Sequence, residues 1–176
     1  MASNEVFKKA HNFVLKWEGG LCDDPADAGG ITKYGVSLRF LKNIKPDATR
    51  NDIINMTKVE ARELFHKHFW DRCRCAEMPD KTAFILYDTA VNVGCMQAVK
   101  FLQRAVGTYV DGLIGPKTIK ATCVVNDNPE TLESILNQRA NFYENLAKNK
   151  PSQRVFLRGW LNRTNDLRKA IKEYKP

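Results

Sequence analysis

The sequence predicts a mainly α-helical protein with one short glycine-rich loop or hairpin near its N-terminus. Apolar residues recur along most of the chain at the i, i+3, i+4 spacing of helices that bury one face. Turn residues dominate only between Leu21 and Val36. At 176 residues, 43% of them apolar, the chain suits one domain, or one domain with a small dependent lobe.

The first expected helix precedes this glycine-rich stretch. Six apolar residues follow a helical spacing and end abruptly at Trp17: Val6, Phe7, Ala10, Phe13, Val14 and Trp17. Gly19 stands where a left-handed C-cap residue belongs. After the loop or hairpin, we expect a short helix at about 37–42.

Two stronger helix signals follow in the first half of the chain. Thr57 and Glu60 have the spacing of a capping box, which predicts a helix that runs to about Arg72. Pro79 and Asp80 begin a second helix, "KTAFILYDTAVNV", which is apolar nearly all round. A helix of that kind is expected to lie at the centre of the protein.

The second half of the chain predicts four more helices. Gly94 interrupts the helical pattern, and "MQAVKFLQRAV" resumes it. The other three helices are expected to begin at prolines, which favour the first turn: Pro116, Pro129 (ending at about Lys148) and Pro151. We place the boundary between two lobes at 93–96, so that the predicted regions are 1–94 and 95–176.

The amino-acid composition indicates the charge of possible partners but does not identify a particular partner. The net charge of +8, from 28 Lys and Arg against 20 Asp and Glu, favours polyanions or simply confers solubility. No basic stripe or helix-turn-helix is visible, so we expect no nucleic-acid partner. Five cysteines include no C-x-x-C pair, and we therefore expect no metal site. We also expect no organic cofactor.

The sequence also bears on membranes and export. No stretch approaches the roughly 20 apolar residues of a spanning helix, so we expect no stable membrane insertion. The N-terminus becomes polar too early for a signal peptide. We expect a monomer made in the cytoplasm.

Glu18 is the strongest candidate for catalysis. A carboxylate at the end of a helix faces the partial negative charge of unpaired carbonyls, and Trp17 limits its hydration. Both effects are expected to raise its pKa and keep it protonated near neutral pH. A protonated carboxyl group is what the general acid of glycoside hydrolysis requires, whereas the alternative is an ordinary solvated helix end.

The stretch after Glu18 supplies further candidates. Its glycines allow a ligand to approach the backbone closely. Asp24 and Asp27 offer a second carboxylate that could activate water or stabilise positive charge on a sugar, and Thr32 could orient that water. The alternative is that these side chains only form turn and cap hydrogen bonds.

A second group of candidates comes from the central helix and from aromatic residues. Asp88 and Asn92 lie four residues apart on an otherwise apolar face, so they either line a glycan cleft or form an internal hydrogen-bond node. Tyr34, Trp70 and Tyr87 are candidate platforms for sugar rings, with core packing the stronger alternative for Trp70.

The stretch "EGGLCDDPADAGGITKYGV" resembles the signature of glycoside hydrolase family 108, which comprises lysozyme-like N-acetylmuramidases. Eleven residues fit at fixed spacing: Glu18, Gly19, Gly20, Asp24, Pro25, Asp27, Gly29, Gly30, Thr32, Gly35 and Val36. "FWDRCRCAEMP" and "LYDTAVNVG" extend the similarity. The resemblance implies a lysozyme-like helical catalytic lobe over 1–94 with Glu18 as the catalytic acid.

The region 95–176 resembles the predicted peptidoglycan-binding domain that commonly follows this catalytic part. "QAVKFLQRAVGTYVDGLIGPKTIKA" and "GWLNR" carry the similarity, although a purely structural role is the favoured interpretation of these residues. Together the two resemblances imply a peptidoglycan hydrolase, or endolysin, that cleaves the β-1,4 bond between N-acetylmuramic acid and N-acetylglucosamine. The implied partners are glycan strands of the cell wall, and the implied origin is a phage or prophage. The alternative is a non-catalytic cell-wall-binding or secretion-accessory protein on the same frame.

Overall fold

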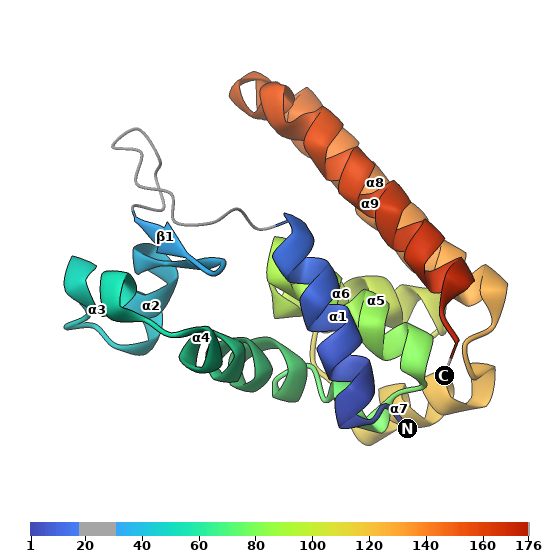
Figure 1. The fold of residues 1–176 in the computed structure, drawn as a ribbon. Coiled ribbons are helices and arrows are strands. Elements are labelled where there is room, and N and C mark those ends of the chain that lie inside the picture. Colours follow the sequence, from blue (N-terminus) through green and yellow to red (C-terminus); the bar gives the residue numbers. More distant parts are fainter. Residues whose placement is uncertain (18–30, 176) are drawn as a thin grey trace.

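A computed structural model of the chain describes residues 1–17 and 31–175 (Figure 1). It is mainly α-helical, which confirms the predicted fold class. The α-helices are α1 (Asn4–Trp17), α2 (Leu38–Ile44), α3 (Arg50–Asn55), α4 (Lys58–Phe65), α5 (Asp80–Val93), α6 (Cys95–Ala105), α7 (Pro116–Val125), α8 (Pro129–Asn149) and α9 (Leu157–Glu173). Three shorter elements are a π-helical turn, η1 (His66–Asp71), and two 3-10 segments, η2 (Cys75–Glu77) and η3 (Pro151–Phe156).

The central helix is α5, as its all-round apolar pattern predicts. Its residues 82–90 are all buried, and it contacts α1, α6, α8 and α9. Such a helix is stable only when neighbours cover every face. In Figure 1, α1 crosses in front of α5, while α8 and α9 form a long antiparallel hairpin that projects away from the body.

The predicted loop or hairpin ends in a β-hairpin. Strands β1 (Thr32–Lys33) and β2 (Val36–Ser37) are antiparallel, with Thr32 opposite Ser37. Tyr34 and Gly35 both have positive φ, 51° and 79°, as a two-residue type I′ turn requires. Ser37 then caps α2, because its hydroxyl accepts a hydrogen bond from the Phe40 N–H.

Several helix boundaries confirm the capping signals. Thr57 and Glu60 form the expected capping box at the start of α4. Pro116 and Pro129 occupy first-turn positions of α7 and α8. The α8 cap is Asn128, whose side-chain oxygen accepts hydrogen bonds from two backbone N–H groups.

Three features differ from the sequence prediction. The helix expected to reach about Arg72 is α-helical only to Phe65 and continues as the π-helical turn η1. The last helix begins as the 3-10 segment η3 rather than as an α-helix. The short helix α3 was not predicted, although Asp52 accepts a hydrogen bond from the Thr49 N–H in a capping box that marks its start.

A buried ionic cluster joins the central helix to the α8–α9 hairpin. Asp88 of α5 receives Arg139 Nη1 at 2.5 Å on one carboxylate oxygen and Arg163 Nη2 at 2.8 Å on the other. The side chains of Asp88 and Arg139 have no exposed surface, and that of Arg163 is 7% exposed. We call these three residues the Asp88 cluster.

The Asp88 cluster has a definite electrostatic balance. Burial alone raises the pKa of Asp88, but the charges and hydrogen bonds of Arg139 and Arg163 outweigh it and leave the pKa lowered. The carboxylate therefore stays ionised, and it compensates two buried guanidinium groups. Removing it would strand two positive charges in the interior.

We expect Asp88→Asn to lower the free energy of unfolding by about 3–5 kcal/mol, because an amide cannot compensate the two guanidinium charges. Urea unfolding at pH 7, followed by circular dichroism, measures this loss. The matched control is Asp166→Asn on α9, a half-exposed site where we expect a change within about 0.5 kcal/mol. A loss below about 1 kcal/mol for Asp88→Asn would contradict the assigned role.

A second buried polar group lies between α1 and α5. His11 is 4% exposed, and its Nδ1 lies 2.9 Å from the Tyr87 hydroxyl oxygen. Rings of Phe7 and Phe65 pack against it. Burial, with a smaller contribution from the charge of Arg62, lowers the pKa of His11 to about 4.

This lowered pKa predicts a pH-dependent stability. Between pH 6.5 and about 4, the unfolded chain binds a proton at His11 that the folded protein does not bind. The contribution of neutral His11 to the free energy of unfolding is therefore lost as the pH falls through this range. The loss amounts to about 3 kcal/mol, at 1.36 kcal/mol per pH unit. We expect His11→Phe to flatten the dependence of unfolding free energy on pH within this window, and an unchanged slope would show that folding does not lower the pKa of His11.

Candidate functional site

The predicted site residues divide into two groups. Glu18, Asp24 and Asp27 lie outside the described residues, so their roles stay predictions. Thr32, Tyr34, Asp88 and Asn92 lie within them, and each can be placed.

The chain is anchored on both sides of residues 18–30. On one side α1 ends at Trp17, which is half-buried, and Val14 one turn earlier has no exposed surface. On the other side Ile31 and Val36 are buried in the same hydrophobic core. The core therefore fixes where the glycine-rich stretch leaves α1 and where it joins the β-hairpin.

The β-hairpin carries two predicted site residues. Thr32 is half-buried on β1, and Tyr34 occupies the first position of the turn. Lys33 Nζ lies 5.3 Å and Lys58 Nζ 5.8 Å from the centroid of the Tyr34 ring. An aromatic ring beside two ammonium groups suits a ligand that combines sugar rings with negative charge.

Asn92 lies near the C-terminal end of α5 and is half-buried. Its Nδ2 donates a hydrogen bond to the backbone oxygen of Asp88 at 2.7 Å. This bond fixes the amide, while its oxygen forms no hydrogen bond with the described residues. Asn92 therefore remains a candidate contact for a hydroxyl or amide of a glycan.

The prediction that Asp88 lines a glycan cleft is wrong for this structure. The carboxylate of Asp88 has no exposed surface, and both oxygens are bound by arginines in the Asp88 cluster. It therefore cannot contact a glycan in this structure. Of the two interpretations of the Asp88–Asn92 pair, Asp88 follows the second, an internal node, because arginines from α8 and α9 bind its buried carboxylate.

Two of the three aromatic candidates are also part of the core. Trp70 is 2% exposed and Tyr87 has no exposed surface. Their ring centroids lie 5.8 Å apart in an edge-to-face contact, and each also contacts Phe7. Only Tyr34 of the three retains exposure that a sugar could use.

The sequence did not predict a groove between α2, α3 and α4. It has a volume of about 700 Å³, and its lining includes the apolar residues Leu41, Met56 and Leu64. The carboxylates of Asp52, Glu60 and Glu63 also line it. No motif signalled the groove, because it arises from the packing of α3, whose helix was itself missed.

Two of the carboxylates that line this groove, Asp52 and Glu60, do not suit a general acid. Hydrogen bonds from Lys45 and Thr49 lower the pKa of Asp52. Hydrogen bonds from Thr57, the N-cap residue of α4, lower the pKa of Glu60. A general acid near neutral pH needs a raised pKa. Both side chains serve instead as N-terminal helix caps.

Residues 1–17 and 31–175 contain neither a candidate metal site nor a candidate membrane span. Within these ranges, no group of three His, Cys, Asp or Glu side chains could hold a metal ion. No helix there has the length and apolar character needed to cross a membrane. Cys73, Cys75, Cys95 and Cys123 are free thiols.

Two known protein families match consecutive regions of the chain. Residues 11–94 match the family described as Glycosyl hydrolase 108, and residues 97–165 match the one described as Predicted Peptidoglycan domain. Residues 11–94 of the chain belong to the glycosyl hydrolase 108 family. All seven predicted site residues fall within the first match, and the two matches together are those of a peptidoglycan hydrolase.

A solved structure extends the comparison to the whole chain. The chain is similar to a structure titled "Structure of Brucella abortus SagA", with 26% sequence identity and a TM-score of 0.84. The similarity covers 96% of this chain and 95% of the other. No curated protein sequence matches the chain.

Proposed function

We propose that this glycosyl hydrolase 108 protein is an N-acetylmuramidase of the endolysin type. It cleaves the β-1,4 glycosidic bond between N-acetylmuramic acid and N-acetylglucosamine, with Glu18 as the general acid. The observation that supports this most is the family match over 11–94, which includes a glutamate directly after α1 ends at Trp17.

In this proposal, Glu18 donates its proton to the glycosidic oxygen as the bond breaks. Positive charge then develops on the sugar ring, in an oxocarbenium-like transition state. Asp27 or Asp24 stabilises that charge or activates the water, and Thr32 orients the water. The separation of the two carboxyl groups, about 5 Å or about 6.5–9.5 Å, decides between retention and inversion.

Two other described residues, Tyr34 and Asn92, contribute binding rather than bond cleavage. Tyr34 offers its ring to a sugar, and Asn92 offers an amide oxygen. The lysines at 33 and 58 flank Tyr34 and favour an anionic polymer such as peptidoglycan. The net charge of +8 adds a long-range attraction that salt should weaken.

We expect Glu18→Gln to reduce the release of soluble muropeptides from purified peptidoglycan by at least about a thousandfold, because glutamine cannot donate the proton. New reducing ends and the masses of the released fragments measure the activity. The matched control is Glu5→Gln, the same change at an exposed position of α1, which should leave activity unchanged. Asp24→Asn and Asp27→Asn in the same assay identify the second carboxylate.

Three outcomes of this assay would contradict the proposal in different ways. If wild type releases no more than Glu18→Gln, the protein is not a hydrolase under these conditions. If both bind cell wall equally and neither cuts it, the accessory-protein alternative holds. Fragments whose new reducing end is a sugar other than N-acetylmuramic acid would show that the protein is a hydrolase but cleaves a different bond.

We expect Tyr34→Asn to raise KM for glycan fragments by about tenfold while kcat changes little, because the ring binds ground state and transition state alike. Asparagine tolerates the positive φ of this position, so the turn should survive. Tyr34→Phe keeps the ring and should keep KM near the wild-type value. Equal KM for all three proteins would exclude Tyr34 as a sugar platform.

A further inference from the structure

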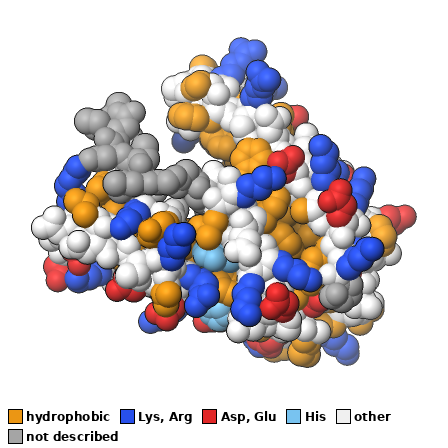
Figure 2. Space-filling view, viewed as in Figure 1, with side chains coloured by type: hydrophobic (Ala, Val, Ile, Leu, Met, Phe, Trp, Pro, Cys, Tyr) orange, Lys and Arg blue, Asp and Glu red, His pale blue; other side chains and the backbone are white. Residues whose placement is uncertain are grey.

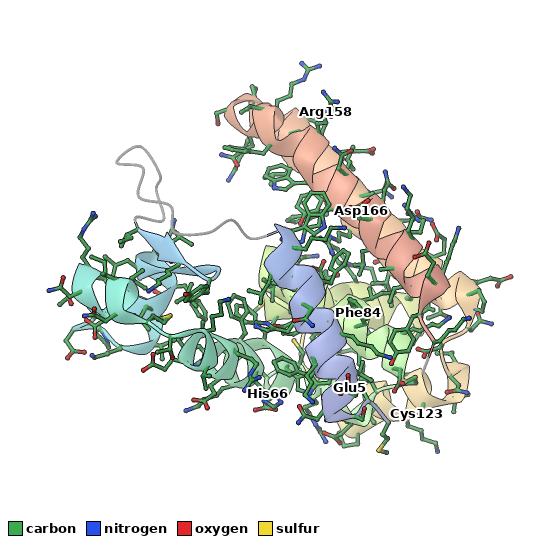
Figure 3. The ribbon with its side chains drawn as sticks, viewed as in Figure 1. Glu5, His66, Phe84, Cys123, Arg158 and Asp166 are labelled. Carbon is green, nitrogen blue, oxygen red and sulfur yellow. The ribbon has the colours of Figure 1, made fainter. Side chains whose placement is uncertain are left out.

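The free end of the α8–α9 hairpin has an unusual charge distribution. Residues 145–165 contain no Asp or Glu. Four basic residues in this range are exposed: Lys148, Lys150, Arg154 and Arg158. None of the four forms an ion pair with the described residues, so no carboxylate within these ranges neutralises their charge directly. Figure 3 shows Arg158 at the free end and Asp166 farther along α9, toward the body.

Two apolar residues lie among these basic side chains. Val155 is 75% exposed and Phe156 is 53% exposed, both in the 3-10 segment η3. They are the only large exposed apolar residues adjacent in sequence within the described ranges. In Figure 2, hydrophobic and basic side chains occur together at this end of the hairpin. We call Val155, Phe156 and the four basic residues the hairpin tip.

The apolar residues of the hairpin tip are supported from within. The Phe156 ring contacts Trp160, with 5.8 Å between centroids, and Trp160 stacks on Tyr143 at 4.8 Å. Tyr143 is 3% exposed and lies in the interior of the hairpin. The stack therefore holds Phe156 in place while about half of its surface stays in contact with water.

The position of the hairpin tip makes it available to a large flat partner. The two helices α8 and α9 run antiparallel, and Figure 1 shows their free end beyond every other labelled helix. The 21 residues of α8 span about 30 Å at 1.5 Å per residue. A planar surface could thus touch the tip without displacing the rest of the protein.

We infer that the hairpin tip is a docking surface for an anionic phospholipid bilayer. Lysine and arginine side chains are attracted to negative headgroups, and adjacent exposed apolar side chains enter the boundary between headgroups and acyl chains. A soluble anionic polymer would use the same charges but would leave Val155 and Phe156 in water. The apolar pair therefore favours the bilayer, in a peripheral contact that includes no spanning segment.

This inference goes beyond the proposed function and does not depend on it. The test uses the full-length protein, sedimented with vesicles of phosphatidylglycerol and phosphatidylethanolamine, or of phosphatidylcholine alone. We expect binding to the anionic vesicles and at least about tenfold weaker binding to the neutral ones. Raising NaCl from about 0.1 M to about 0.5 M should weaken it further, because the Debye length shortens.

Two pairs of variants separate the apolar and the charged contributions. Val155→Ser with Phe156→Ser should weaken binding to anionic vesicles by about tenfold, whereas Val124→Ser on α7, equally exposed at 75%, should not. Arg154→Glu with Arg158→Glu should abolish binding, and Lys117→Glu with Lys120→Glu, the same charge change on α7, should weaken it much less. All these sites are exposed, so the thermal unfolding of each variant should match wild type.

The inference is overturned by any of three results. Wild type fails to sediment with anionic vesicles, or the hairpin-tip variants bind as well as their α7 controls. In the third, the protein binds a soluble polyanion such as DNA with the same dependence on Arg154 and Arg158 but does not bind vesicles. That result would assign the tip to anionic polymers instead.

Discussion

One carboxylate between two arginines holds together the parts of this molecule that are distant in sequence. Asp88 lies on the fully buried helix α5, and its partners come from α8 and α9. Charges withdrawn from water are tolerated only when they are paired in good geometry, so each of the three helices can occupy its place only if the other two do. The direction of the α8–α9 hairpin, and with it the position of the hairpin tip, follows from this pairing. The Asp88 cluster thus connects the centre of the fold to its most distant end.

The two regions that match different families are packed together in the interior of the protein. Residues 11–94 and 97–165 match different families, yet their buried side chains form one hydrophobic core. Leu86 from the first region and Leu102 from the second both belong to it and are almost wholly buried. The peptidoglycan domain therefore completes the fold of the glycosyl hydrolase 108 domain. This structural role does not exclude wall binding by its exposed surface, which is a separate property.

Local features of the structure were predictable from the sequence, and distant ones were not. The capping box at Thr57, the proline starts of α7 and α8 and the turn before α2 all depend on residues within a few positions of one another. The chemistry proposed for Glu18 is local in the same sense. By contrast, Asp88 meets arginines 51 and 75 residues away, so periodicity could identify a polar residue on an apolar helix but not its partners. Trp70 and Tyr87 illustrate the same limit, since burial depends on the packing of several helices. The helix α3 was missed because six residues carry too little periodicity to be recognised.

The single core has a consequence for how such proteins can be recombined. A fragment that ends near Gly94 would keep Asp88 but lose Arg139 and Arg163, and would uncover the face of α5 that α6, α8 and α9 bury. A chimaera that joins this catalytic region to another C-terminal region must therefore supply two arginines at equivalent positions, together with a matching apolar surface. Evolution faces the same restriction, so the two regions are expected to be inherited as one unit although they belong to two families. In this protein, the pairing of Asp88 with two arginines in the interior determines which parts of the chain must stay together, and the boundary between domains does not.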